Sequence, residues 1–456
     1  MKGYYLYGAG RYVEYFVQLI RYLGDEVIGI VDRDLKKQGK SFCGIEVYPP
    51  EKLLSSEHEI IISCMATEEI RNIIKEMGIA SREIPVADYL SEKYQTPLSQ
   101  RNIPFHESIL CFDLCSGEKW GGAENWNYFL ADQYKKRTSG KSVMLISDEY
   151  KDEQFCDRVP LFKFSKDDGI KTIDDLLSNE EGISFVNSFF GHSFFAFLAM
   201  KMENPGKVRI ITIVHNDYKD LYRACDMFKD YIDEFICVSS KIQKVVIGDC
   251  GVQENKVHFF YQPMYNCDQD FRKQSSDEIR IGVATRLTKP QKRLDYLPGI
   301  IDLLETKKIR YRMYIAGDGD FYKFLDEYIK KKHLHNKVLL LGKIEHNKMW
   351  DYWNNVDIYL NFSDFEGSSL AMLESMSCAC VPIVTDVSGT RDYIQDGVNG
   401  FIVDVGDIGS LCERIEYFSN NKKEIEIMGE KARESVVEKC NVDSYIRKFS
   451  DILRDI

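Results

Sequence analysis

Long hydrophobic runs are missing from this 456-residue sequence. The longest apolar stretch, SFFAFLAM at 193–200, is far shorter than the roughly 18 residues that a membrane-spanning helix needs. The first residues, MKGYYLYGAGRY, enter a folded pattern without the apolar segment and cleavage site of a signal peptide. We therefore expect a cytoplasmic protein whose contact with a membrane, at its inner face, is peripheral.

The sequence also lacks an excess of positive charge and a metal-binding cysteine pattern. Its formal net charge of -12 argues against a nucleic-acid-binding surface over the whole molecule. The 13 cysteines include no CxxC pair, and an odd number at irregular positions makes a poor disulfide framework. The prediction is a protein with reduced thiols, no bound metal and no nucleic-acid partner.

Short apolar strands alternate with amphipathic helical patterns along the whole sequence. This alternation is typical of α/β proteins, in which crossover helices cover parallel sheets. The pattern restarts twice, which predicts a Rossmann-like domain at 1–94, a linker at 95–107, and two further domains at 108–263 and 264–440. A last helix at 441–456 is expected to pack back on the N-terminal half.

In the first domain, the loop GAGRYV follows a strand and precedes a helix. Gly8 and Gly10 would turn the chain so that helix amides face a phosphate, and Asp32 ends the next strand, where a ribose-binding acid would lie. The third glycine of the dinucleotide pattern is replaced by Val13. A nucleotide site and a plain tight turn both remain open here.

In the second domain, two features lie where strands of the predicted sheet end. Gly121 and Gly122 join the first strand to its helix and allow a ligand to approach the backbone. His215 ends a later strand at the same edge, where ligands of open parallel sheets bind. Either feature alone also fits a structural role.

The third domain places cations and acids after its first two strands. Arg286 and Lys292 suit a diphosphate, because arginine forks onto phosphate oxygens and lysine acts as a point charge. Gly317 begins a glycine turn in which Asp318 and Asp320 have the spacing of a metal-binding pair. The turn explains these two acids without a metal.

The segment DFEGSSLAMLES at 364–375 carries two glutamates eight positions apart. Glu366 lies in a predicted turn, and Glu374 lies in a helix that we expect to start at Ser368 or Ser369. Free amides from Gly367 to Leu370 would suit a phosphate, and a carboxylate binds two adjacent hydroxyls. The pair could hold the hexose and the ribose of a nucleotide sugar, or Glu374 could simply face water.

Taken in order, these residues resemble family four of the retaining glycosyltransferases, which has the GT-B fold of two Rossmann-like domains facing a cleft. The likeness covers about 108–456. Its matching segments are GGAE at 121–124, His215, VSS at 238–240, Arg286, Lys292, AGDGD at 316–320, EGSSLAMLES at 366–375 and DGVNGFIVDVGD at 396–407.

The resemblance implies a role for each candidate residue. Arg286 and Lys292 would hold the donor diphosphate, Glu374 the ribose and Glu366 the transferred sugar. His215 and the loop of Gly121 and Gly122 would face that sugar from the other domain. The anomeric configuration would be retained, and no metal or other cofactor would be required.

The first domain resembles the small Rossmann-like domain at the front of some sugar acyltransferases, over about 2–90. Its ligand, whether a nucleotide, an acceptor, a partner subunit or a second copy of the chain, stays open. The basic segment YKKRTSGK at 134–141 fits contact with an anionic membrane or a solvated helix end.

Together these observations predict a glycosyltransferase that moves a sugar from a nucleoside diphosphate to a glycan or lipid-linked acceptor in cell-surface polysaccharide assembly. Three alternatives remain: an NAD-dependent epimerase or dehydrogenase built on the loop at Gly8, a metal-dependent transferase using Asp318 and Asp320, and a non-catalytic sugar-nucleotide-binding scaffold.

Overall fold

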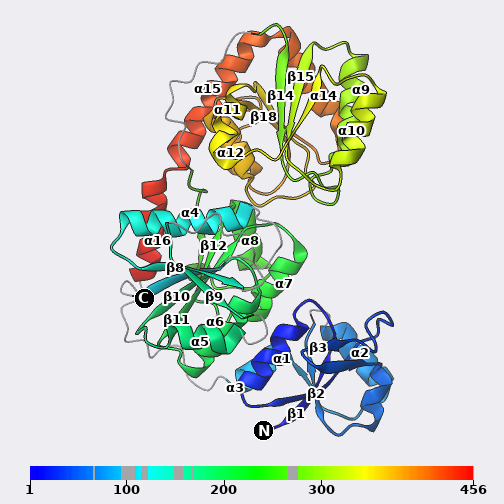
Figure 1. The fold of residues 1–456 in the computed structure, drawn as a ribbon, viewed down its shortest axis with the longest axis vertical. Helices are drawn as coiled ribbons and strands as arrows, with labels where there is room; N and C mark the ends of the chain where they lie inside the picture. The colour runs from blue at the N-terminus through cyan, green and yellow to red at the C-terminus, as the bar shows by residue number, and fades with distance from the viewer. Residues whose placement is uncertain are drawn as a thin grey trace.

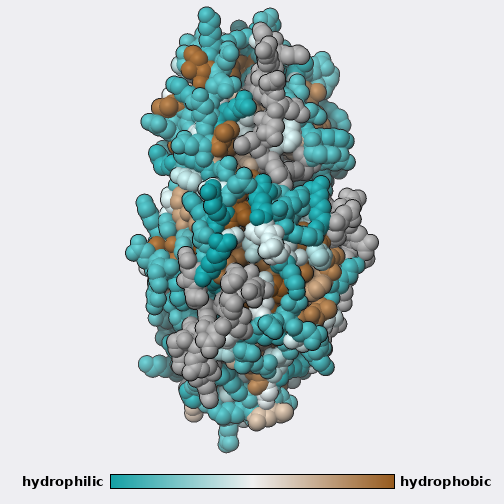
Figure 2. Space-filling view, turned by 90° about the vertical axis from the view of Figure 1, so that its left-hand side faces the viewer, coloured by the Kyte–Doolittle hydropathy of each residue, from teal (hydrophilic) through white to brown (hydrophobic). Residues whose placement is uncertain are grey.

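The computed structural model describes residues 1–64, 67–93, 108–113, 122–147, 158–165, 169–264 and 276–454. Within these ranges the chain forms three sheets, each covered by helices, that follow one another along the longest axis of the molecule (Figure 1). No helix in these ranges has both the length and the apolar character that crossing a bilayer requires. Hydrophilic side chains predominate on the face shown in Figure 2.

The first sheet has the strand order β3-β4-β2-β1-β5-β6, in which only the pair β3 and β4 is antiparallel. Its elements are β1 (Gly3–Tyr7), α1 (Val13–Tyr22), β2 (Glu26–Val31), β3 (Ser41–Phe42), β4 (Ile45–Tyr48), the 3-10 helix η1 (Pro50–Ser55), β5 (Glu59–Ile62), α2 (Thr67–Glu76), β6 (Glu83–Pro85) and α3 (Val86–Lys93).

The second sheet is wholly parallel, with the order β13-β12-β11-β10-β7-β8-β9. Its elements are β7 (Ile109–Asp113), α4 (Gly122–Arg137), β8 (Ser142–Ser147), β9 (Leu161–Phe164), α5 (Gly169–Leu177), β10 (Ile183–Asn187), α6 (His192–Glu203), β11 (Val208–Val214), α7 (Lys219–Phe228), β12 (Glu234–Cys237), α8 (Ser240–Gly248), η3 (Glu254–Lys256) and β13 (Val257–Phe259).

The third sheet is also wholly parallel, with the order β16-β15-β14-β17-β18-β19. Its elements are β14 (Ile279–Ala284), η4 (Leu294–Tyr296), α9 (Leu297–Thr306), β15 (Tyr311–Ala316), α10 (Tyr322–Lys331), β16 (Val338–Gly342), η5 (His346–Lys348), α11 (Met349–Asn354), β17 (Ile358–Asn361), α12 (Leu370–Ser377), β18 (Val381–Thr385), α13 (Thr390–Tyr393), β19 (Phe401–Val403), α14 (Ile408–Asn420) and α15 (Lys422–Lys439).

Both parallel sheets have the doubly wound order in which the first strand of the domain lies in the middle. The direction of the connections reverses between β7 and β10 in the second sheet, and between β14 and β17 in the third. Ligands of such sheets bind beside the carboxyl ends of the strands at this reversal. The loops that follow β14 and β17 are therefore the first place to look for a site.

The first domain is joined to the second by a continuous apolar core rather than by a few surface contacts. Helix α1 packs against α6, where the ring of Phe16 meets that of Phe195 edge to face at 5.1 Å. Tyr15 lies against His192 at the start of α6, with ring centroids 4.4 Å apart. Burial of these large rings favours one rigid unit made of the first two domains.

The last helix, α16 (Val442–Arg454), leaves the third domain and lies against α4 of the second (Figure 1). One face of α16 is buried in the core of the second domain, and its Tyr445 meets the Trp126 ring of α4 edge to face at 5.8 Å. At the other edge of this contact, Arg137 of α4 forms an ion pair with Asp443. The helix thus links the two domains that carry the candidate site.

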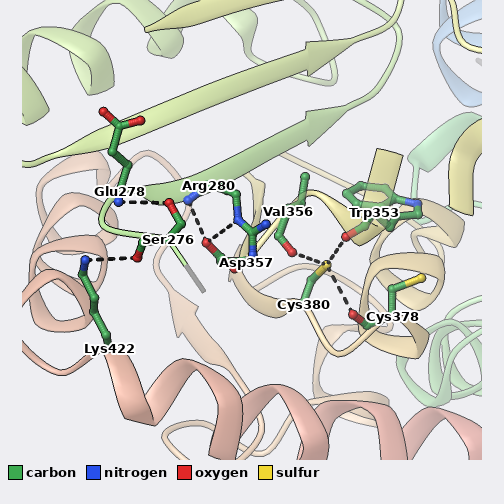
Figure 3. Close-up of polar contacts among 9 residues, drawn as sticks. All are labelled: Ser276, Glu278, Arg280, Trp353, Val356, Asp357, Cys378, Cys380 and Lys422. Carbon is green, nitrogen blue, oxygen red and sulfur yellow. Dashed lines mark hydrogen bonds and ion pairs between the residues drawn. The ribbon is translucent and has the colours of Figure 1, made fainter. Parts of the chain in front are cut away.

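An ion pair fixes the two central strands of the third sheet at their amino ends. Arg280 of β14 and Asp357, just before β17, form a two-pronged contact in which the guanidinium Nη2 donates to Oδ1 at 2.6 Å and Nε to Oδ2 at 3.0 Å (Figure 3). The backbone amide of Arg280 donates to the same carboxylate at 2.9 Å. This contact sets the register of β14 and β17, and so the position of the loops at their other ends.

Replacing Arg280 by alanine is expected to lower the free energy of unfolding by about 3–5 kcal/mol, because the largely buried Asp357 carboxylate loses its charged partner. Chemical denaturation measures this loss. Arg312→Ala, which breaks the exposed pair with Glu278 next to the same sheet, should cost less than about 1 kcal/mol. Equal losses in the two variants would contradict the assigned role of Arg280.

Candidate active site

The loops after β14 and β17 meet through an ion pair between Lys292 and Glu366. The Lys292 ammonium lies 2.5 Å from Oε1 of Glu366, and the two side chains are 17% and 8% exposed. Ser363 Oγ donates a second hydrogen bond to the same oxygen at 2.8 Å. Two residues that lie 74 positions apart in sequence are therefore neighbours at the reversal point of the sheet.

Further contacts hold these two loops together. The amide of Asp364 donates to the carbonyl oxygen of Gln291 at 3.0 Å, and the Gln291 side chain donates back to the carbonyl oxygen of Phe365 at 3.1 Å. Arg293 contacts both carboxylate oxygens of Asp364 at 3.0 Å. Arg286 is exposed on the same loop and, within the described ranges, has no carboxylate partner. Arg286 is thus a cation on the same loop as Lys292 that stays available to a ligand.

Helix α12 begins immediately after this pair, at Leu370, as the serine cap in the sequence predicts. The Ser369 hydroxyl accepts a hydrogen bond from the amide of Met372, and Tyr359 OH lies 3.2 Å from the same hydroxyl. Ser368 precedes the cap in the turn that follows Gly367. The first amides of α12 are thus presented next to Glu366, in the position in which a helix N-terminus stabilises an anion.

Glu374 lies one turn into α12 and is only partly exposed, so it does not simply face water. Its Oε2 accepts a hydrogen bond from the indole Nε1 of Trp353 at 3.3 Å. Trp353, at the end of α11, is fully buried, and its carbonyl oxygen accepts the thiol of Cys380 (Figure 3). No sequence pattern indicates Trp353 as a partner of Glu374, because 21 residues separate the two.

Gly317 follows β15 and packs against the loop after β14. Its φ is 137°, and a Cβ there would lie 1.8 Å from the carbonyl oxygen of Thr285. Only glycine fits this close backbone approach. The adjacent Asp318 bonds locally, its Oδ1 accepting the amide of Gly319. Within the described ranges, no three His, Cys, Asp or Glu residues come together as a metal-binding group.

His215 lies at the carboxyl end of β11 in the second domain. Its Nε2 is 2.9 Å from Ser188 Oγ, and its ring meets that of Trp126 edge to face at 5.2 Å. Burial lowers the pKa of the imidazole to about 3, although part of the residue stays accessible to solvent. His215 is therefore neutral at physiological pH and does not supply a positive charge.

The two domains touch where His215 meets Gly367. A Cβ on Gly367 would lie 1.8 Å from the carbonyl oxygen of His215, and Asn216 pairs with Gly367 as an antiparallel bridge. Nearby, Ser240 donates through its amide to Asp392 at 2.9 Å. The carboxyl edges of the second and third sheets thus meet at the loops that carry His215 and Glu366.

Of the two glycines predicted to line the site in the second domain, the structure describes Gly122. Gly122 begins α4, and a Cβ there would lie 3.9 Å from the Leu370 side chain, so the start of α4 lies across from the start of α12. Gly121 lies outside the described residues.

Asp113 ends β7 at the same edge and is buried, with Ser193 Oγ donating to its Oδ1 at 2.9 Å. Burial raises the pKa of its carboxyl from 3.8 to about 7, with a smaller contribution from Glu124. The protonated form is thus favoured in the folded chain. Its contribution to stability is complete below pH 3.8 and is lost as the pH rises through about 7.

Asp113→Asn removes this titration while keeping the shape of the side chain. The free energy of unfolding of the wild type should fall relative to the variant by up to about 1.4 kcal/mol per pH unit between the two pKa values. Denaturant titrations at pH 5 and pH 8 measure the difference. A difference that does not change with pH would contradict the raised pKa.

The loop of Gly8 and Gly10 lies where β1 ends, and Asp32 ends β2 beside it. The Asp32 carboxylate accepts the amide of Ala9 at 2.7 Å and the amide of Asp34 at 2.8 Å, and it pairs with Lys37 at 3.0 Å. These bonds hold the glycine loop to β2. They also occupy the oxygens that a ribose would need.

The basic segment at the end of α4 is neutralised by acidic neighbours. Three of its four cations form ion pairs, which are Lys136 with Asp132, Arg137 with Asp443 and Lys141 with Glu180. A solvated helix end is the better description of this segment. Most cysteines of the described ranges are buried.

Two Rossmann-type domains whose carboxyl edges face each other, preceded by a third, smaller one, define the GT-B class of fold with an additional N-terminal domain. Residues 268–435 match the family described as glycosyl transferases group 1, and residues 3–85 match the family described as C2185-like, N-terminal. The C-terminal part of the chain is therefore similar to the glycosyl transferases group 1 family.

Individual relatives agree with this assignment. Poly(ribitol-phosphate) alpha-N-acetylglucosaminyltransferase of Staphylococcus aureus (strain COL) is 26% identical over 258 residues, 55% of this chain and 51% of that protein. N-acetyl-alpha-D-glucosaminyl L-malate synthase of Bacillus anthracis is 24% identical over 198 residues, 43% of this chain and 51% of that protein. The chain spans about half the length of these curated relatives.

The crystal structure of Anabaena Alr3699/HepE in complex with UDP and glucose shares the fold. It aligns with a TM-score of 0.63 at 16% identity, over 77% of this chain and 100% of that chain.

Proposed function

We propose that this chain is a retaining, metal-independent glycosyltransferase that moves a sugar from a nucleoside diphosphate to a glycan or lipid-linked acceptor in cell-surface polysaccharide biosynthesis. The observation that carries the proposal is the meeting of Lys292 and Glu366 at the reversal point of the third sheet. The first amides of α12 follow Glu366, Arg286 lies on the same loop as Lys292, and the backbone of His215 meets Gly367 from the second domain.

Each group has a task that its chemistry suits. Arg286, Lys292 and the first amides of α12 hold the diphosphate, since cations and a helix N-terminus stabilise phosphate oxygens. Glu374, fixed by Trp353, accepts the ribose hydroxyls. Glu366 accepts hydroxyls of the transferred sugar, and Lys292 shares its charge between this carboxylate and the diphosphate.

The reaction then needs no metal ion and no covalent intermediate. The bond between the anomeric carbon and the phosphate oxygen breaks, and its electron pair leaves with the diphosphate. The acceptor hydroxyl attacks the same face of the sugar, and its proton passes to the departing phosphate oxygen. The fixed cations and amides stabilise the charge that develops on the diphosphate.

The names of the relatives suggest the first donors to test. Two of them are N-acetylglucosaminyl enzymes by name, and the Anabaena structure contains UDP and glucose. UDP-N-acetylglucosamine and UDP-glucose are therefore the starting donors, with glycan and lipid-linked acceptors. We place the reaction in the cytoplasm at the inner face of the membrane, with the first domain serving a partner subunit, a second copy or the acceptor.

A transfer assay with a panel of nucleoside diphosphate sugars tests the proposal. We expect product with one or two donors, an anomeric linkage like that of the donor by NMR, and an unchanged rate in the presence of a chelator. An inverted linkage would contradict the retaining mechanism. Loss of activity with chelator and its return with manganese would favour the alternative based on Asp318 and Asp320.

The NAD-dependent alternative is disfavoured by the contacts of Asp32. An NAD ribose would have to compete for a carboxylate that already binds two amides and Lys37. Tight NAD binding that is lost in Gly10→Ala would support this alternative. Binding of a sugar nucleotide without transfer to any acceptor would support a non-catalytic scaffold.

A further inference from the structure

A chain of buried hydrogen bonds runs from His215 into the interior of the second domain. His215 Nε2 contacts Ser188 Oγ at 2.9 Å, and Ser188 Oγ contacts Asn127 Oδ1 at 2.7 Å. Asn127 Nδ2 then contacts the backbone carbonyl oxygen of Asp113 at 2.6 Å. Asn127 is fully buried and Ser188 is 7% exposed, so water does not compete for these groups.

The direction of every bond in this chain follows from chemistry. A carbonyl oxygen only accepts, so the nitrogen of the Asn127 amide faces Asp113 and its oxygen faces Ser188. The Ser188 hydroxyl has one proton, which it donates to Asn127. The Ser188 oxygen must therefore accept a hydrogen bond from the Nε2–H of His215.

We infer that Ser188 and Asn127 are positioning residues that fix His215 as the tautomer protonated at Nε2, with Nδ1 free to accept a hydrogen bond from a hydroxyl of the transferred sugar. Nδ1 of His215 has no hydrogen-bond partner within the described ranges and is not among the buried unpaired atoms there. This inference rests on the proposed function, since it assigns a role to His215 in holding the donor.

The assigned tautomer has a consequence for the donor. A nitrogen lone pair accepts a hydrogen bond and repels a carboxylate, so the group of the donor sugar that meets His215 is a hydrogen-bond donor, for which we propose a hydroxyl. The Trp126 ring, itself packed on Tyr445 of α16, holds the imidazole from the side. The orientation of His215 is thus set by α4, β10 and the C-terminal helix together.

Nitrogen NMR of the protein labelled at its histidine rings tests the inference. The signals of His215 are assigned by their loss in His215→Gln. We expect an unprotonated Nδ1 and a protonated Nε2 at pH 7. A protonated Nδ1 would overturn the inference.

Two variants probe the chain of bonds from different positions. Asn127→Leu frees the Ser188 proton to point at His215, so the proton of the ring should move from Nε2 toward Nδ1, an effect that passes from residue 127 to the ring through Ser188. Ser188→Ala removes the acceptor of Nε2, so a mixture of tautomers is expected. Ser184→Ala, which removes a buried serine at the other end of β10, is the matched control and should leave the tautomer unchanged.

In the same proteins, kcat/KM for the active donor should fall about tenfold in Ser188→Ala and stay near wild type in Ser184→Ala, since one hydrogen bond of about 1.4 kcal/mol is a factor of ten. If neither variant changes the tautomer of His215 while the protein still transfers sugar, the positioning role of Ser188 and Asn127 is overturned and the proposed function stands. A tautomer that responds as expected in a protein that transfers nothing would overturn the proposed function and leave the positioning role standing.

Discussion

Gly367→Ala is expected to reduce sugar transfer by at least about 100-fold while leaving the three domains folded. A Cβ at this position would lie 1.8 Å from the carbonyl oxygen of His215 and 2.9 Å from the Val238 side chain. The obstacle is backbone at the end of β11, so a side-chain rotation does not relieve the clash and the two domains must move apart. The second and third domains would then be unable to bring His215 and Glu366 together.

Steady-state kinetics and calorimetry on the same variant distinguish a loss of contact between the second and third domains from a loss of folding. Binding of UDP to the third domain should change by no more than a few-fold, and thermal unfolding should match that of the wild type. Gly248→Ala is the matched control, since a Cβ there meets nothing within 4 Å and its φ lies outside the left-handed region. Normal transfer by Gly367→Ala would show that the observed contact of the two domains is not needed for the reaction.

Lys292→Ala should lower kcat by about 10²–10³, the effect of removing one charged group that stabilises a transition state. The variant loses the ammonium that pairs with Glu366 and that we assign to the diphosphate. Glu366→Gln keeps the hydrogen bond from Ser363 but loses the charge, and it should reduce turnover strongly as well. Initial rates at saturating donor give kcat for each variant.

Lys323→Ala provides the control for loss of a positive charge on the same domain. Its side chain is 89% exposed on α10, and the variant should transfer at the wild-type rate. If Lys292→Ala behaved like Lys323→Ala, the ion pair with Glu366 would be structural and the donor site would lie elsewhere.

The fold was largely predictable because its signals are local and periodic. The apolar runs of the third domain form its strands β14 to β19, since a buried parallel strand is a continuous apolar run. The strands without such a run are β3, β4, β6 and β9, which have two to four residues each and lie at or next to the edges of their sheets. Short edge strands bury too little apolar surface to leave a pattern.

Features of the candidate site that depend on one sequence segment could be predicted. Features that depend on contacts between distant segments could not. The start of α12 follows from the capping ability of Ser369. Trp353, Ser188 and Asn127 were not singled out, because each is an ordinary buried residue until the fold brings it to Glu374 or His215. The contact of α1 with α6 was hidden for the same reason.

Hydrogen exchange of the full chain with and without UDP tests whether the third domain holds the donor. We expect UDP to slow exchange of amides in the loop after β14, around Arg286 to Arg293, and at the start of α12 from Leu370 to Met372. We expect no change at the loop of Gly8 and Gly10. Protection confined to that N-terminal loop, with none at α12, would contradict the assignment of the donor site to the third domain.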